Sequence, residues 1–268
     1  MLPPFLAELP QLFALVVFRL AGLMMVAPLV GSDKIPRPIK LYIAVAMALC
    51  MCATIGRMPR PDVMPDSPWR LAVGLGGELA FGLLAGTLLT LAFVAARWAG
   101  GLAGQQMGFN MAGNFNPTAD FGGSPLGDAY FFLTLLLFLQ MDGHHAMVLG
   151  VRESFDALPP LSVGLDRDGL DLFTRMVGGA TGLAMRIAGP VCVAMLVVDL
   201  SLGMLGKTIP ALNLLSVGLS VRAMVGLAVV ILGLSVTGSL LVGAMNDGLD
   251  LTRLLWNNDA AGAVTNLR

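Results

Sequence analysis

Long apolar runs constrain this chain more than any other feature of its sequence. They cover residues 9–30, 41–56, 71–96, 129–151, 176–205 and 223–245. Several approach the ~20 residues that a helix needs to cross a bilayer. Hydrophobic residues make up 56% of the 268 positions and charged residues 12%, whereas a soluble domain carries about 25% charged residues. We therefore expect an all-α, polytopic membrane protein with about six hydrophobic helices.

The apolar runs also predict how the chain is organised. Residues 1–25 lack the basic start of a signal peptide, and Arg19 interrupts their apolar run, so we expect a retained first membrane helix. The fifth run contains Pro190 and is long enough to form two helices. Residues 165–173 predict a short amphipathic piece at the membrane surface. We expect one integral-membrane domain over residues 1–250 and a short polar tail over 251–268.

Composition excludes several function classes. The net charge is -1, which gives no electrostatic case for binding nucleic acid. Cys50, Cys52 and Cys192 all lie in apolar runs, where a thiol usually packs as a small hydrophobic group. The Cys50–Cys52 pair has no companion ligand pair nearby, so we expect neither a metal site nor a cofactor. The loops 31–40 and 57–70 carry three basic residues each, so the positive-inside rule leaves the orientation open.

Residues 100–125 form an unusual connector between two apolar runs. The segment is rich in glycine, carries one formal charge (Asp120), and has phenylalanines at positions 109, 115 and 121. Ordinary connectors are short, and exposed backbone in lipid is costly unless protein covers it or it lines a cavity. The segment therefore predicts a pore, a gate or a tightly packed partner surface, and Met107 and Met111 within it are candidates for a constriction.

Five charged residues lie within or beside the apolar runs, namely Arg19, Glu78, Asp142, Arg186 and Asp199. Each would cost at least about 2.5 kcal/mol in lipid, so each should pair or face water. An ion or proton pathway is one interpretation. Structural salt bridges between helices or subunits are the favoured interpretation, because no run carries the closely repeated acids of a proton relay.

The sequence Asp142-Gly143-His144-His145 resembles a catalytic cluster at first sight. Two zinc-binding histidines on a helix need the spacing of H-E-x-x-H, which places both on one face. Adjacent residues of a helix point about 100° apart, and the chain has no other histidine. We therefore interpret His144 and His145 as polar contacts in a packed helix, with no catalytic residues.

Glycines recur at the four-residue spacing that lets helix backbones approach closely. Gly100, Gly104 and Gly108 form one such series, and Gly82 pairs with Gly86. The glycines could pack helices within this chain or dock neighbouring subunits, and the sequence does not separate the two.

A short internal repeat is also present. Arg19-Leu20-Ala21-Gly22 corresponds to Arg186-Ile187-Ala188-Gly189, and Val26-Ala27 to Val193-Ala194. Repeats occur in membrane transport folds, but in so biased a composition chance similarity is the favoured explanation.

Motifs along almost the whole chain resemble the FliR/SctT family of type III secretion export-gate proteins. The matching pieces are FRLAGLMMVAPLVG (18–31) with Pro36, Pro38 and Lys40, GGEL from Gly76, GGLAGQQMGFNMAGNFNP (100–117), GHH (143–145) with Ser154-Phe155, and VVDLSLGMLGKTIPALN (197–213). The chain departs from the usual family pattern at Lys207, Pro210-Ala211 and Val221-Arg222.

The resemblance implies a non-enzymatic subunit of the flagellar type III export gate, built of helical hairpins. It implies FliP-like and FliQ-like membrane partners, further export-apparatus membrane proteins, and unfolded flagellar proteins as cargo. It places the chain in the bacterial cytoplasmic (inner) membrane, at the flagellar basal body. The loop near 108–125 would plug the closed channel, with motif positions at Gly108, Phe109, Asn116 and Pro117; Met107, Met111, Phe115 and Phe121 complete the predicted plug residues.

Three other functions are weighed against the flagellar export gate. The first is an injectisome export-gate subunit of the same family. The second is a small-molecule secondary transporter, which the intramembrane charges and the repeat would suit. The third and weakest is a membrane hydrolase using His144 and His145.

Overall fold

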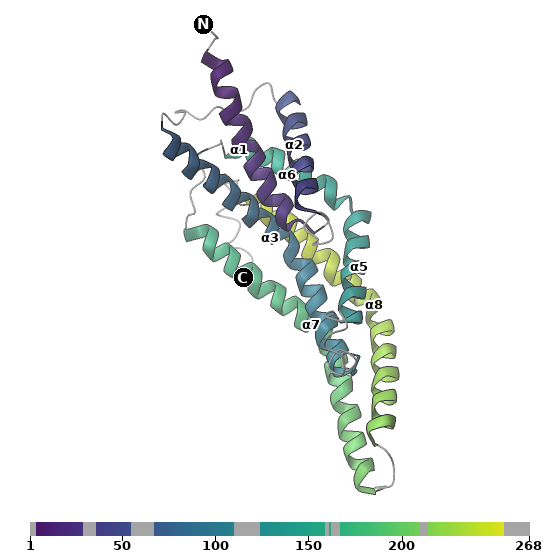
Figure 1. The fold of residues 1–268 in the computed structure, drawn as a ribbon. Helices are drawn as coiled ribbons and strands as arrows, with labels where there is room; N and C mark the ends of the chain where they lie inside the picture. Colours follow the sequence, from purple (N-terminus) through teal and green to yellow (C-terminus); the bar gives the residue numbers. More distant parts are fainter. Residues whose placement is uncertain are drawn as a thin grey trace. The chain divides into compact units, whose positions relative to one another are not determined.

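The computed structural model describes residues 4–28, 36–54, 67–109, 124–158, 161, 167–208 and 214–254. Every regular element in these ranges is an α-helix (Figure 1). The helices are α1 (Pro4–Val26), α2 (Arg37–Thr54), α3 (Pro68–Gln106), α5 (Pro125–Gln140), α6 (Gly143–Ala157), α7 (Arg167–Thr208) and α8 (Leu214–Leu254). In its described part, each predicted apolar run is mainly helical, which confirms the all-α membrane class.

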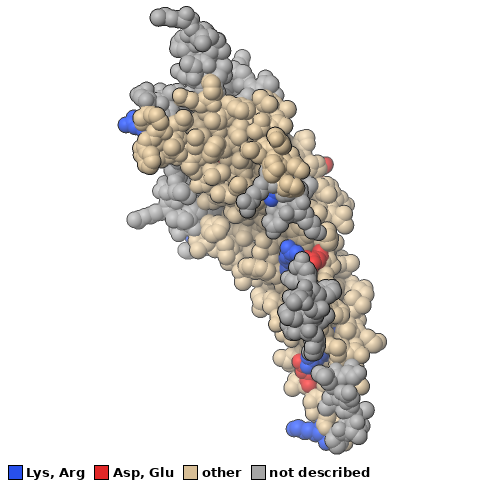
Figure 2. Space-filling model, in the orientation of Figure 1, with Lys and Arg blue, Asp and Glu red and all other residues tan. Residues whose placement is uncertain are grey.

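Three helices are long and apolar enough to cross a membrane in the described part of the chain, namely Pro68–Gln106, Phe173–Thr208 and Val217–Asp250. A fourth candidate is the pair α5 and α6, which bends by 67° at its break. Pro10–Val26 and Pro38–Met51 are shorter apolar helices. On the face drawn in Figure 2, the charged side chains are few and scattered.

The helix boundaries correct four of our expectations. The fourth run breaks at Met141–Asp142, where Asp142 takes the left-handed conformation (φ 52°). The fifth run stays one helix despite Pro190, and residues 167–173 belong to that helix instead of forming a separate surface piece. Helix α3 extends to Gln106, so Gly100 and Gly104 are helical.

The chain packs as two compact units. One unit comprises Met1–Leu91, Asp142–Met176 and Asn246–Arg268, and the other comprises Ala92–Met141 and Val177–Met245. Our expectation of a single domain over 1–250 stays a prediction, and residues 255–268 of the expected tail lie outside the described residues.

The first unit has a core of apolar side chains from α1, α2, α6 and the first half of α3. Its fully buried members include Leu20, Ala44, Ala48 and Phe155. Leu23, Met24, Leu89, Met147 and Val151 pack in the same cluster. The core therefore joins segments that are far apart in the sequence.

Glycines let α1 and α3 approach closely in the first unit. A Cβ atom on Gly82 would clash with the carbonyl of Arg19, and one on Gly22 with the carbonyl of Leu79. A Cβ on Gly86 would lie 2.9 Å from the carbonyl oxygen of Leu23. The predicted Gly82–Gly86 spacing thus packs two helices of this chain.

The second unit is built from the end of α3, α5 and most of α7 and α8. Phe93 is the centre of an aromatic cluster, with ring centroids 5.5 Å from Phe138 and 5.8 Å from Phe131. Helices α7 and α8 run side by side as a hairpin (Figure 1), and a Cβ on Gly218 would lie 3.4 Å from Leu202 Cδ1.

The α1–α3 contact predicts different effects at two glycines of α3. Gly82→Ala should destabilise the chain by roughly 2 kcal/mol or more, because overpacking a tight contact costs about 1–3 kcal/mol. Gly76→Ala is the matched control, since a Cβ there meets nothing within 4 Å and alanine favours helix. Thermal unfolding in detergent measures both. Equal melting temperatures for the two variants would contradict the close contact.

Candidate functional site at the base of the glycine-rich segment

Helix α3 ends in a glycine-dependent turn. The N–H of Phe109 donates to the carbonyl of Gly104 (2.9 Å), and the N–H of Gly108 donates to the carbonyl of Gln105 (3.1 Å). Gly108 has φ 82°, a conformation that favours glycine. These features define a Schellman motif, in which a left-handed residue after the last helical turn satisfies the free carbonyls. Gly108 therefore fixes the direction in which the chain leaves α3.

The chain returns from the segment at a well-capped helix start. Ser124 is the N-cap of α5, and its hydroxyl oxygen accepts a hydrogen bond from the N–H of Gly127 (3.3 Å). Pro125 occupies the first helical position, which suits its fixed φ and missing N–H. Asp128 lies in the first turn, where a negative charge interacts favourably with the helix dipole.

The start of α5 lies directly against the backbone of α3. A Cβ on Gly100 would lie 2.5 Å from the carbonyl oxygen of Leu126 and 2.6 Å from the Cα of Gly127. The hydroxyl of Ser124 also donates to the carbonyl of Gly100 (3.3 Å). Gly100 and Gly108 are separated by about 12 Å along the helix. Both ends of the glycine-rich segment are thus held on the last turns of α3.

A salt bridge lies beside this contact. Arg97 Nη2 is 2.6 Å from Asp128 Oδ1, with both side chains about half exposed, and the guanidinium lies 5.5 Å from the centroid of the Phe131 ring. An exposed pair of this kind contributes about 0–1 kcal/mol. The salt bridge therefore adds little to the close contact at Gly100.

Three predicted plug residues, Met107, Gly108 and Phe109, lie in the part of the chain that the structure describes. Met107 is fully buried, and a Cβ on Gly226 of α8 would collide with its side chain. Phe109 is 37% exposed. Met107 therefore packs α3 against α8, and Phe109 is the first partly exposed aromatic side chain of the segment. The other predicted plug residues lie outside the described residues: Met111, Phe115, Asn116, Pro117 and Phe121.

Arg19 and Glu78 form a buried ion pair between α1 and α3. Arg19 Nε donates to Glu78 Oε2 at 2.5 Å, and the two side chains are 2% and 0% exposed. The guanidinium carbon lies 4.2 Å from the ring centroid of Phe155 and 5.0 Å from that of Phe81. An arginine over aromatic faces is further stabilised by cation–π attraction.

The ion pair also holds the end of α6 and the residue Leu161. The guanidinium donates to the carbonyl oxygens of Ser154 (3.2 Å) and Leu158 (3.3 Å). A positive charge at a helix C-terminus is favoured by the helix dipole. Glu78 Oε1 accepts from the N–H of Leu161 (3.0 Å), whose φ is 73°. One pair of charges therefore connects three separate parts of the first unit.

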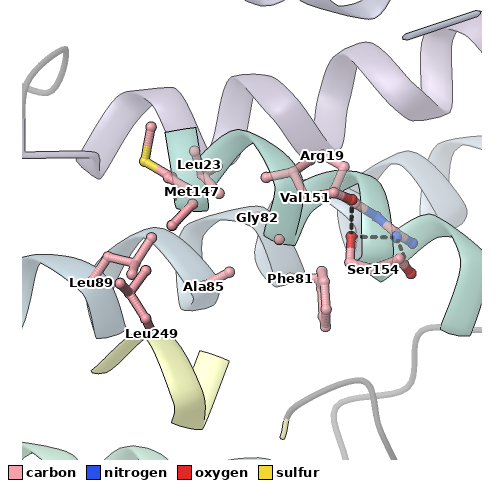
Figure 3. Close-up of a pocket in the computed structure, with 12 residues that line it drawn as sticks. Arg19, Leu23, Phe81, Gly82, Ala85, Leu89, Met147, Val151, Ser154 and Leu249 are labelled. Carbon is pink, nitrogen blue, oxygen red and sulfur yellow. Dashed lines mark hydrogen bonds between the residues drawn. The ribbon is translucent and has the colours of Figure 1, made fainter. Parts of the chain in front are cut away.

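A small cavity adjoins Arg19 (Figure 3). Its lining includes Leu23, Gly82, Met147, Val151 and Leu249. The space open to the centre of a water molecule is about 20 Å³, close to the 10–15 Å³ that one water needs. Arg19 and Ser154 are its polar members, and both already make hydrogen bonds. The cavity offers no free polar group to an organic ligand.

The other intramembrane charges have different surroundings. Asp199 Oδ1 of α7 lies 2.6 Å from Arg222 Nη2 of α8. We did not predict a role for Arg222, because its position suggested a connector, whereas α8 already begins at Leu214. Asp142 and Arg186 are both exposed.

The two histidines have no place in a packed interior. His144 and His145 are exposed on α6, so in this chain they are not the polar contacts of a packed helix that we expected. The apolar run alone did not indicate this exposure.

Nearly the whole chain matches one family of known proteins. The family model described as "Bacterial export proteins, family 1" matches residues 11–248, which include α2, α3, α5, α6 and α7 in full. The chain belongs to this family.

Relatives in the family agree with the resemblance seen in the sequence. The chain is 30% identical over 220 residues to flagellar biosynthetic protein FliR of Aquifex aeolicus, covering 81% of this chain and 83% of the relative. It is 27% identical over 222 residues to FliR of Caulobacter vibrioides, covering 83% and 88%. Yop proteins translocation protein T of Yersinia pestis is 23% identical over 183 residues, covering 68% and 69%. The FliR/SctT resemblance is thereby confirmed.

The α3–α5 contact predicts contrasting effects at two adjacent glycines. Gly100→Ala should push the start of α5 away from α3 and lower stability by roughly 1–3 kcal/mol. Gly101→Ala should leave stability unchanged or raise it, since a Cβ there meets nothing within 4 Å. The rate at which a protease cuts the 110–123 segment reports the local change, and unfolding reports the global one. Indistinguishable behaviour of the two variants would contradict the contact.

Proposed function

We propose that this chain is a subunit of the flagellar type III protein export gate. It forms part of the channel through which unfolded flagellar proteins cross the bacterial cytoplasmic membrane at the basal body. The single observation that carries this proposal is the family match over residues 11–248. The relatives named FliR cover more than four fifths of the chain at 27–30% identity in two species.

The partners in this proposal are FliP-like and FliQ-like membrane subunits, together with further membrane proteins of the export apparatus. The apolar surface of the chain supports assembly with other membrane helices. In the most apolar 18-residue stretch of each helix, only 28% of α7 and 22% of α8 are buried within the chain, against 56% of α3. Faces left open in this way require lipid or protein cover.

A role for the glycine-rich segment is part of the same proposal. Residues 108–125 act as a plug that closes the channel until export begins. The held ends at Gly108 and Ser124 support this role, because a closure device needs a fixed base. The near-neutral composition of the segment supports it too, since a charged plug would retain water around itself.

A secretion-type gate is the second candidate. The relative from Yersinia pestis is named a translocation protein for Yop proteins, and its identity over 183 residues is 23%. The higher identity and coverage of the FliR relatives favour the flagellar system. A small-molecule transporter is less favoured, because the buried charges Arg19 and Glu78 already bind one another.

Purification with partners tests the assembly. Affinity purification in mild detergent from cells that express the whole export apparatus should recover two further small helical membrane proteins, identified by mass spectrometry. The chain should be less stable alone than in that complex, because binding to the folded state raises stability. A stable homo-oligomer that transports a small solute by itself would reject the export gate and favour the transporter.

Replacing residues 110–121 by six Gly and Ser residues tests the plug. Such a linker spans up to about 20 Å and leaves Gly108 and Ser124 in place. The variant should assemble normally and let ions and small solutes leak through the membrane. Gly101→Ala is the control variant and should leave the membrane as impermeable as the wild-type chain does. Normal permeability in a fully assembled variant complex would rule out the plug.

A further inference from the structure

Between Gly178 and Val193, one face of α7 carries a single charge on an otherwise small and apolar surface. The face, here called the Arg186 face, comprises Gly178, Gly182, Met185, Arg186, Gly189 and Val193. Successive helical residues are 100° apart, so these six lie on one side of α7. All are exposed except Gly189, which is half-buried. A Cβ on any of its glycines would meet nothing within 4 Å.

Arg186 lies within a helix that is long and apolar enough to cross a membrane. The apolar helix runs from Phe173 to Thr208, and Arg186 lies about 20 Å along it from Phe173 and about 33 Å from Thr208. A charged side chain that faces lipid without a partner is costly. Within the described ranges no ion pair involves Arg186. Pro190 also has no N–H to donate to the Arg186 carbonyl. Bare lipid is therefore a poor environment for this residue.

In the first unit, a short sequence similar to that around Arg186 packs against another helix. Arg19-Leu20-Ala21-Gly22 on α1 repeats as Arg186-Ile187-Ala188-Gly189 on α7. On α1, Arg19 binds Glu78 of α3. Gly22 touches the backbone of α3 at Leu79, and Gly82 of α3 touches the backbone of α1 at Arg19.

Helix α3, which packs against α1 at this point, carries an acidic residue four positions before a glycine. Glu78 precedes Gly82 by four residues on α3, so the carboxylate and the small residue lie on the same face. The carboxylate binds the arginine, and the glycine allows the backbones to approach closely. On α7 the corresponding arginine and glycine, Arg186 and Gly189, have neither contact within the described chain.

We propose that the Arg186 face binds an apolar helix of a partner subunit, and that this helix carries an Asp or Glu one turn before a small residue. Charge complementarity and the internal Arg19–Glu78 example both support this occupant. A second copy of the chain is less suitable, because its Glu78 is buried against its own Arg19. The inference rests on the proposed function in assuming that the chain assembles with membrane partners.

Charge reversal at Arg186 tests the ion pair. Arg186→Glu should reduce recovery of partner subunits by roughly tenfold or more, because like charges in contact cost several kcal/mol. Lys207→Glu makes the same charge change in the last turn of the same helix and should leave recovery unchanged. An Asp- or Glu-to-Arg change in the partner helix should restore recovery for Arg186→Glu only.

Two results would overturn the inference. One is wild-type partner recovery for Arg186→Glu. The other is loss of folding of Arg186→Glu when the chain is expressed without partners, because Arg186 would then have a partner within its own chain.

A photo-crosslinking amino acid at Met185 identifies what covers the face. The expected product joins α7 to a partner helix within one turn of an acidic residue. Crosslinks to lipid alone, to this chain or to a second copy would overturn the inference. If the wild-type chain recovers no membrane partner, the proposed function fails instead, and the crosslink still identifies the occupant of the face.

Discussion

The buried ion pair between Arg19 and Glu78 is the interaction on which the first unit depends. Neither charge can remain alone in a dry interior, since the effective penalty is several kcal/mol per ion. Each group is therefore satisfied by several partners. Arg19 reaches Glu78 and the carbonyls of Ser154 and Leu158, and Glu78 also reaches Leu161. This requirement fixes α1, α3 and the end of α6 at one point.

Close glycine contacts supply the geometry that such polar contacts need. Gly22 and Gly82 bring α1 and α3 together beside the ion pair, and Gly100 brings α3 against the start of α5. In the second case the contact holds the base of the glycine-rich segment, where Gly108 and Ser124 fix the exit and the return of the chain. Packing and the proposed closure of the channel therefore depend on the same kind of contact.

The helices could be predicted well from the sequence, because hydrophobicity determines what can lie in a membrane. The sequence also singled out Arg19 and Glu78 as charges within apolar runs, and Gly82 and Gly100 by the four-residue spacing of their glycines. The pairing of Arg19 with Glu78 could not, because 59 residues separate them and packing decides which charges meet. The break at Asp142 was missed, since one left-handed residue leaves no periodic signal. Arg222 was missed because charged residues at the end of an apolar run are usually assigned to connectors.

A double-mutant cycle on the buried pair tests the central claim most directly. The free energy of unfolding in detergent would be measured for Arg19→Met, Glu78→Met and the variant with both changes. Each single change leaves an uncompensated buried charge and should cost about 3–5 kcal/mol. The double change should cost clearly less than the sum, with an interaction energy of at least about 1 kcal/mol. Strictly additive losses would show that the two charges do not depend on each other and would contradict the account.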